Sequence, residues 1–151
     1  MNVDTLCEEL SEDEGCKYSI YLDHLGFPTF GIGHLIRSSD PEYNQPVGTE
    51  VPEERVRNVF ILDVAVTKID CLRLYPDFDM LPEECQLIIA NMMFNMGYKR
   101  LSKFKKMRAA VNKRDWDIAA DEMVDSRWNT QVPNRAKRLV KRMRDLAEDT
   151  G

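Results

Sequence analysis

The stretch that decides the fold is residues 13–35, DEGCKYSIYLDHLGFPTFGIGHL. In the segment that leads into it, residues 3–14, apolar side chains recur at helical spacing, and Gly15 is the residue type best suited to end such a helix. Residues 18–22 then alternate in the manner of a strand, and residues 29–32 form a second β-rich run after a glycine-containing turn. The sequence therefore predicts a helix followed by a β-hairpin.

The rest of the chain is predicted to contain one loop and several helices. Residues 37–51 are rich in Ser, Asp, Pro and Gly, which is typical of a loop, and a long helix is predicted to start at Pro52. Further helices are predicted at about residues 82–96, 102–111, 115–125 and 134–147, the third with Asp115 as its N-cap. We expect an α+β fold in a single domain, residues 1–151. Its expected lobes are a β lobe at 15–51, a connecting helix at 52–71, and a helical lobe formed by 1–14 and 72–151.

Composition limits the class of protein. The chain has 151 residues, of which 43% are hydrophobic and 31% charged, and this balance excludes a disordered or fibrous protein. No apolar run approaches the roughly 20 residues that cross a bilayer. The first residues are acidic, whereas a secretory signal begins with basic residues and continues into an apolar core. We therefore expect a soluble protein that is made in the cytoplasm without a signal peptide.

The four cysteines do not form a metal-binding pattern. Cys7, Cys16, Cys71 and Cys85 contain no CxxC pair, and the chain has only two histidines to assist them. Free or packed thiols are therefore favoured over a structural zinc site, and a disulfide stays open.

Charge is distributed unevenly along the chain. The net charge is −5, but residues 1–98 carry 6 basic and 18 acidic side chains, whereas residues 99–144 carry 15 basic and 5 acidic ones. The basic segment either attracts an anionic polymer, such as nucleic acid, a membrane surface or a cell wall, or forms solvated helix faces that pair with the acidic half.

Three residues of the opening stretch have the chemistry of a glycosidase. Glu14 lies in the last turn of its predicted helix, where the backbone dipole disfavours a carboxylate, so the position breaks a local rule. Asp23 ends the first predicted strand and Thr29 begins the second. An acid, a carboxylate and a hydroxyl that holds water are the groups that hydrolyse a glycosidic bond. Taken singly, each also fits a structural role: a surface glutamate, a turn cap and a strand threonine.

Three motifs together resemble the phage-type lysozymes, the muramidases of glycoside hydrolase family 24. They are residues 13–35, residues 91–97 (NMMFNMG) and residues 126–138 (SRWNTQVPNRAKR), and they occur in the family's order. The resemblance implies a small β lobe and a helical lobe joined by a long helix. It also implies hydrolysis, with inversion, of the β-1,4 bond between N-acetylmuramic acid and N-acetylglucosamine, by a monomer without metal or organic cofactor.

The resemblance also implies roles for individual residues. Glu14 matches the general acid, Asp23 the carboxylate beside the attacking water, and Thr29 the hydroxyl that helps to hold that water. Arg135 matches an arginine that pairs with the catalytic glutamate. The positions that match substrate-binding or supporting residues are Leu35, Phe104, Gln131, Trp128 and Asn91, and for Trp128 and Asn91 core packing is an equal alternative. His34 and Asp63 match a structural ion pair, which should raise the pKa of His34.

The expected partner is bacterial peptidoglycan, reached after release from the cell, with no nucleic-acid partner and no stable membrane insertion. Two other functions stay open. One is a catalytically inactive wall-binding protein with the lysozyme fold. The other is a polyanion-binding domain that uses the basic runs at 99–108 and 135–144. The chain is also shorter between His34 and Asp63 than the T-even phage enzyme, so substrate contacts there are not carried over.

Overall fold

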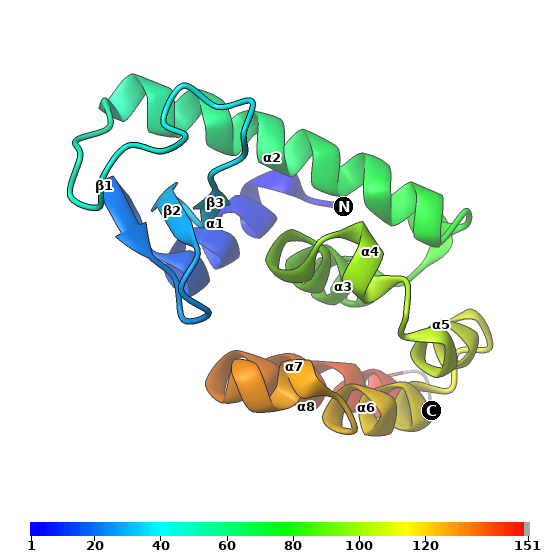
Figure 1. The fold of residues 1–151 in the computed structure, drawn as a ribbon. Coiled ribbons are helices and arrows are strands. Elements are labelled where there is room, and N and C mark those ends of the chain that lie inside the picture. Colours follow the sequence, from blue (N-terminus) through cyan, green and yellow to red (C-terminus); the bar gives the residue numbers. More distant parts are fainter. Residues whose placement is uncertain (150–151) are drawn as a thin grey trace. The chain divides into compact units, whose positions relative to one another are not determined.

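The computed structural model describes residues 1–149 and contains helices α1–α8, a short 3₁₀ helix and one three-stranded sheet (Figure 1). The predicted α+β class is confirmed. The chain divides into two compact units, Val3–Thr67, here called the sheet unit, and Met1–Asn2 with the chain from Lys68 onward, here called the helical unit. This division groups the first helix with the sheet, whereas the expected lobes placed residues 1–14 with the helices. In the described part of the chain, no helix combines the length and apolarity needed to cross a membrane.

The sheet unit begins as the sequence predicts. Helix α1 spans Val3–Glu14, and Gly15 follows it with φ 71° while its N–H donates to Ser11 O at 3.0 Å. A glycine in this left-handed conformation is a common way to end a helix, because it satisfies a free carbonyl without a Cβ penalty. The chain therefore leaves α1 directly after Glu14.

Three antiparallel strands follow in the order β1-β2-β3, formed by Lys17–Leu22, Pro28–Gly31 and His34–Leu35 (Figure 1). Strand β3 was not predicted, because two residues are too few to show an alternating pattern. Ile32 and Gly33 form the turn between β2 and β3, and Gly33 has φ 65°, a conformation that favours glycine.

The pairing of the strands assigns side chains to the two faces of the sheet. Ile20 and Phe30 belong to a buried cluster that is completed by Val51, Val56 and Val59, with Ile36 packed against it. Tyr21 pairs with Thr29, and Thr29 pairs with Leu35, after an irregularity in β1 between Lys17 and Tyr21. Because successive residues alternate and paired residues share a face, Tyr21, Thr29 and Leu35 lie on the face opposite the cluster.

The predicted loop at 37–51 is irregular but tied to the sheet by its backbone. Gly48 N–H donates to Ile20 O at 2.8 Å, Ile20 N–H donates to Thr49 O at 2.9 Å, and Val51 N–H donates to Tyr18 O at 2.9 Å. These bonds satisfy the outer edge of β1, which would otherwise be open to pairing with another chain.

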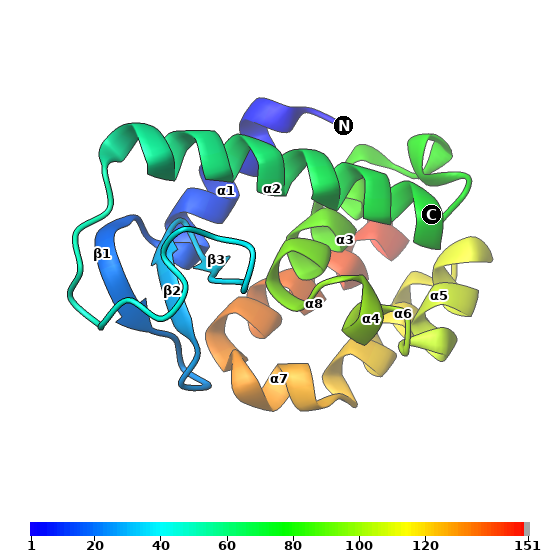
Figure 2. The same cartoon turned by 45° about the horizontal axis from the view of Figure 1, so that its top comes forward.

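Helix α2, Glu53–Leu74, begins one residue after Pro52 and runs across the boundary between the two units in the sequence. The helical unit contains η1 (Phe78–Met80), α3 (Glu83–Met96), α4 (Tyr98–Leu101), α5 (Lys105–Asn112), α6 (Trp116–Val124), α7 (Arg127–Gln131) and α8 (Pro133–Asp149). Within this unit α6 packs against α5 and α8, and α3 also packs against α8 (Figure 2). The core includes Ile88, Met92, Met107, Met123 and Met143, all at most 1% exposed.

Some details of the helical prediction are wrong. Asp115 precedes α6 but its side chain makes no capping hydrogen bond, since its ψ of 76° lies far from the extended backbone that brings a capping side chain to the next amides. Ser126 before α7 has that extended backbone, with ψ 156°, and its side chain accepts from Asn129 N–H. The helix predicted at 102–111 starts only at Lys105, and η1, α4 and α7 are too short for a periodic signal.

Candidate active site

Glu14 lies in the last turn of α1, and its side chain reaches the turn between β2 and β3. A Cβ built on Gly33 would lie 2.2 Å from Glu14 Oε2, 2.8 Å from its Cδ and 3.0 Å from its Cγ. Ordinary van der Waals contact with a Cβ begins at about 3.4 Å, so the end of Glu14 lies directly against the bare backbone of Gly33. The helix end and the sheet turn thus meet at this carboxyl group.

Asp23 lies in the turn between β1 and β2 and is held by the backbone of that turn. The N–H groups of Leu25 and Phe27 each donate to Asp23 Oδ1 at 2.9 Å. The main chain closes the same turn, because Asp23 N–H donates to Phe27 O and Gly26 N–H donates to Asp23 O, both at 2.9 Å. This carboxylate is therefore fixed in orientation by two donors to one of its oxygens.

Thr29 is buried at 3% exposure, and its hydroxyl donates to Phe27 O at 2.9 Å. Because the hydroxyl proton is used in this bond, Thr29 Oγ1 presents its lone pairs as hydrogen-bond acceptors. The same Phe27 carbonyl also accepts from Asp23 N–H. The Phe27 carbonyl therefore links Asp23 to Thr29.

The pKa of Tyr21 is affected by the charges of both Glu14 and Asp23. This half-buried phenol lies opposite Thr29 in the sheet, and the Lys17 Nζ lies 4.2 Å from the centre of its ring. Burial raises the pKa of Tyr21 above its ordinary value of 10, and the charges of Glu14 and Asp23 raise it further. Tyr21 thus lies on the face of the sheet that carries Thr29, and its pKa responds to the charges of both carboxyl groups.

Leu35 is the supporting position that belongs to the same face. It pairs with Thr29 across β2 and β3 and is 48% exposed. An exposed leucine beside this group of residues fits the predicted substrate contact better than a core role.

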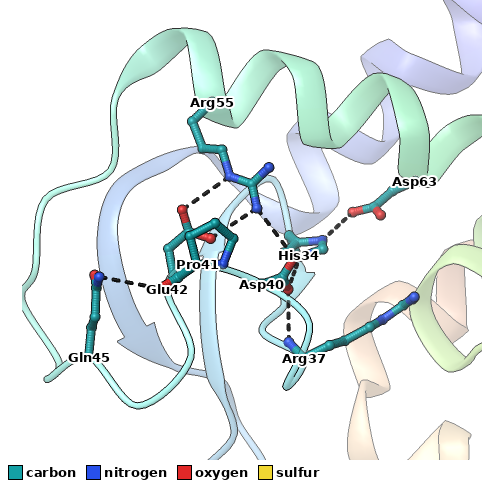
Figure 3. A network of polar contacts seen from close by, with 8 residues as sticks. All are labelled: His34, Arg37, Asp40, Pro41, Glu42, Gln45, Arg55 and Asp63. Atoms are coloured by element: carbon teal, nitrogen blue, oxygen red, sulfur yellow. Dashed lines mark hydrogen bonds and ion pairs between the residues drawn. The ribbon is translucent and has the colours of Figure 1, made fainter.

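His34 and Asp63 lie together, as the resemblance implies, but the structure adds a second carboxylate that the sequence did not predict. His34 Nδ1 lies 2.7 Å from Asp63 Oδ2, and its Nε2 lies 2.9 Å from Asp40 Oδ2 (Figure 3). Burial alone lowers the pKa of His34, but the hydrogen bonds and charges of Asp63 and Asp40 outweigh it and leave the pKa raised. The imidazole therefore favours its charged form, which donates from both nitrogens.

Arg55 of α2 extends this network into the irregular loop. Its Nε donates to Glu42 Oε2 at 3.1 Å, and its Nη2 lies 3.0 Å from Glu42 Oε1 and 3.3 Å from Asp40 Oδ1 (Figure 3). Glu42 is only 8% exposed, so this two-point contact satisfies a buried charge. The loop, β3 and α2 are thus joined by side chains.

The remaining predicted site residues lie in the helical unit. Arg135, 7% exposed, donates from Nε to Asn91 Oδ1 at 2.7 Å, and Trp128 donates from Nε1 to Asn95 Oδ1 at 2.8 Å. Trp128 and Asn91 are 2% and 1% exposed, which favours packing and support over direct contact with a polymer.

Gln131 and Phe104 are more accessible than these buried residues. Gln131 Oε1 accepts from Arg100 Nη2 at 2.7 Å, and Phe104 lies partly exposed directly before α5. The pairing of Arg135 with Glu14 stays a prediction.

The four cysteines are free thiols. Burial raises the pKa of Cys71 and Cys85 to about 12, so both stay protonated near neutral pH. Among residues 1–149, no group of three or more His, Cys, Asp or Glu side chains is arranged to hold a metal ion.

Sequence reasoning missed several residues of this region. The sequence predicts Tyr21 only as a strand residue, because its pairing with Thr29 depends on the strand register. Gly33 lies directly after the second predicted β-rich run, and the two glycines of the GIGH run were a signal for a tight turn there. No sequence pattern predicts the contacts among Asp40, Glu42 and Arg55. The first two residues lie in an irregular loop and the third lies on a helix, so their side chains meet only in the folded structure.

Comparison with known proteins gives one family. The phage lysozyme family model matches residues 11–145. Probable T4-type lysozyme 2 of Dictyostelium discoideum is 31% identical over 157 residues, which cover 91% of this chain and 92% of that protein.

Two phage proteins match over smaller shares of their own length. The pre-baseplate central spike protein Gp5 of Enterobacteria phage T4 is 29% identical over 90% of this chain but 27% of that protein. The peptidoglycan hydrolase gp36 of Pseudomonas phage phiKMV is 29% identical over 90% of this chain but 15% of that protein.

The family match covers both units, from the end of α1 to α8, and includes each motif quoted from the sequence. The relative from Dictyostelium matches over nearly its full length, so the similarity extends to the whole fold. The chain belongs to the phage lysozyme family.

Proposed function

We propose that this protein is a lysozyme that hydrolyses bacterial peptidoglycan at the β-1,4 bond between N-acetylmuramic acid and N-acetylglucosamine. The observation that carries the proposal is the grouping of an acid, a carboxylate and a hydroxyl around strand β1. Asp23 N–H and the Thr29 hydroxyl donate to the same Phe27 carbonyl, and Glu14 lies against Gly33 in the turn that follows the strand of Thr29. The charges of Glu14 and Asp23 also both raise the pKa of Tyr21, which lies opposite Thr29. Family membership and the name of the phiKMV relative support the same substrate.

In the proposed reaction Glu14 is the general acid. Its proton passes to the glycosidic oxygen as the bond to the anomeric carbon breaks, and the departing sugar leaves as an alcohol. Glu14 then carries a negative charge until it takes a proton from solvent.

Asp23 and Thr29 would direct the water that attacks the opposite face of the sugar. Leu25 and Phe27 amides donate to Asp23 Oδ1, so Oδ2 is the oxygen that would accept a proton from the water. Thr29 Oγ1 donates its own proton to Phe27 O and would accept the second hydrogen of the water. With both hydrogens held, a lone pair of the water points at the anomeric carbon, and single displacement inverts the configuration.

Replacing Glu14 by Gln tests the role of the acid. The variant keeps the shape of the side chain but has no acidic proton to donate, so kcat for release of reducing ends from purified peptidoglycan should fall about 100- to 10,000-fold. Glu12→Gln is the matched control, because Glu12 is an exposed glutamate on the same helix and should keep wild-type activity. Equal rates for Glu14→Gln and wild type would remove Glu14 from the mechanism.

Product analysis tests the bond and the stereochemistry. Borohydride reduction of the new ends should yield muramitol, because cleavage after N-acetylmuramic acid leaves that sugar at the reducing end. Proton NMR during the first minutes should show the α-anomer, since inversion converts a β bond into an α product.

Wall binding without new reducing ends would instead support the inactive wall-binding alternative. Salt-sensitive binding of DNA or liposomes at equal strength would support the polyanion-binding one.

A further inference from the structure

Gly33 lies where no other amino acid could lie without meeting Glu14. It occupies the second position of the turn between β2 and β3, with φ 65°. A Cβ at this position would lie 2.2 Å from Glu14 Oε2, far inside ordinary contact distance. The carboxyl group that we propose as the acid therefore occupies the space that a side chain at residue 33 would need.

Two other glycines of the sheet unit share the positive φ of Gly33 but do not lie against a carboxyl group. They therefore show the effect of backbone strain without the contact to Glu14. Gly31 has the same φ of 65°, but a Cβ there would meet Val56 Cγ1 in the apolar core at 3.0 Å. Gly48 has φ 94°, and a Cβ there would meet nothing within 4 Å. A left-handed backbone accounts for glycine at all three positions, but only at Gly33 does the missing side chain make room for a carboxyl group.

The turn that carries Gly33 is held firmly from its other side. The next residue, His34, contacts Asp63 at 2.7 Å and Asp40 at 2.9 Å, and it also pairs with Phe30 in the sheet (Figure 3). These contacts fix the backbone of the turn, whereas the end of a glutamate side chain moves at low energy. An added side chain at residue 33 would therefore displace Glu14 rather than the turn.

We infer that Gly33 is a positioning residue whose bare backbone face sets where the Glu14 carboxyl group lies. This inference rests on the proposed function. A methyl group at residue 33 would push Glu14 Oε2 away by more than about 1 Å, and a misplacement of about 1 Å in a catalytic group can lower the rate about 100-fold.

The test compares Gly33→Ala with Gly48→Ala. Both variants place alanine at a positive φ, so both should unfold at a lower temperature than wild type because of backbone strain. With peptidoglycan as substrate, below both unfolding temperatures, Gly33→Ala should lower kcat about 100-fold with KM changed less than about twofold. Gly48→Ala should keep the wild-type kcat. A Gly33→Ala variant as active as Gly48→Ala would overturn the inference.

Asparagine at residue 33 covers the case in which alanine prevents folding. Asn tolerates positive φ better than other residues that carry a Cβ, so Gly33→Asn should fold more stably than Gly33→Ala while still displacing Glu14. Its kcat should be reduced to a similar extent, and a Gly33→Asn variant with wild-type kcat would argue against the inference.

Carbon-13 NMR of the Glu14 carboxyl group tests the same inference without any activity. Its resonance should shift in Gly33→Ala and Gly33→Asn and stay at the wild-type position in Gly48→Ala. If wild type hydrolyses no peptidoglycan but the resonance still shifts, the proposed function is wrong and the positioning role stands. If the resonance does not shift, the positioning role is wrong whatever the activity.

Discussion

His34 is the residue in the sheet unit with the most demanding electrostatic surroundings. Its two ring nitrogens lie within hydrogen-bond distance of Asp63 and Asp40, and the residue is 8% exposed. Only the imidazolium form donates to both carboxylates at once. Protonation of this one side chain is therefore coupled to the attachment of β3 to α2 and to the loop that carries Asp40.

The pKa directions of this group predict how stability depends on pH. Burial lowers the pKa of His34, but its two carboxylate partners raise it more, so its contribution is complete below the ordinary value of 6.5 and is lost as pH rises through the folded pKa. Burial raises the pKa of Asp40, but the Arg37 amide and His34 lower it more. The contribution of Asp40 is complete above its ordinary value of 3.8 and is lost as pH falls through the folded pKa.

We therefore predict that the network stabilises the fold most between about pH 4 and 6.5 and less at higher pH. Urea unfolding measured from pH 5 to 9 should show a falling free energy of unfolding for wild type and a flatter dependence for His34→Gln. The variant should also be less stable at pH 6 by about 1–3 kcal/mol, since two carboxylates lose a charged donor. His24→Gln, at the exposed second histidine, is the control and should follow wild type. Parallel curves for wild type and His34→Gln would exclude the coupling.

At the scale of elements, helix α2 holds the irregular loop through one arginine. Arg55 contacts Glu42 with two nitrogens, and one of these also reaches Asp40. A guanidinium makes such two-point contacts because it is planar, whereas an ammonium group is a point charge. The shape of this side chain, and not its charge alone, attaches residues 37–51 to the helix.

Arg55→Lys should therefore destabilise the protein although it conserves charge. We expect a loss of about 1–2 kcal/mol in the free energy of unfolding, because Glu42 is buried and would lose one of its two hydrogen bonds. Chemical denaturation measures this loss, and Arg57→Lys, at an exposed arginine two residues along the same helix, should leave stability within about 0.5 kcal/mol of wild type. If Arg55→Lys were as stable as Arg57→Lys, the two-point contact of Arg55 with Glu42 would add nothing beyond the charge of residue 55.

The elements also show which features a sequence can predict. Helix α1, its end at Gly15 and the hairpin depend on local periodicity and turn chemistry, and the structure has them where the pattern placed them. The missing cap at Asp115 depends on a backbone angle that residue type does not determine. The contacts of Arg55 with Glu42 and of Glu14 with Gly33 join residues that are 13 and 19 positions apart, so no local pattern contains them. Residue types and the family resemblance predicted the candidate acid, carboxylate and hydroxyl, but not the groups that contact them.

At the scale of the whole molecule, acidic and basic side chains are concentrated in different parts of the chain. Residues 1–98 carry 18 acidic and 6 basic side chains, and residues 99–144 carry 5 and 15. The cell wall that we propose as substrate is anionic, so only the second segment attracts it. Lys103, Lys105 and Lys106 are exposed and lie in or directly before α5.

We predict that added salt lowers kcat/KM on peptidoglycan while leaving kcat unchanged. The screening length falls from about 30 Å at 0.01 M salt to about 10 Å at 0.1 M, so attraction between the basic segment and the wall weakens over this range. Lys105→Gln with Lys106→Gln should lower kcat/KM about tenfold at 0.01 M and flatten its salt dependence, without loss of stability, since both side chains are exposed. Arg57→Gln with Lys68→Gln, at two exposed basic residues outside this segment, is the control for loss of two charges. A kcat/KM that rises with salt would instead mean that the acidic segment dominates the approach to the wall, because screening would then remove repulsion.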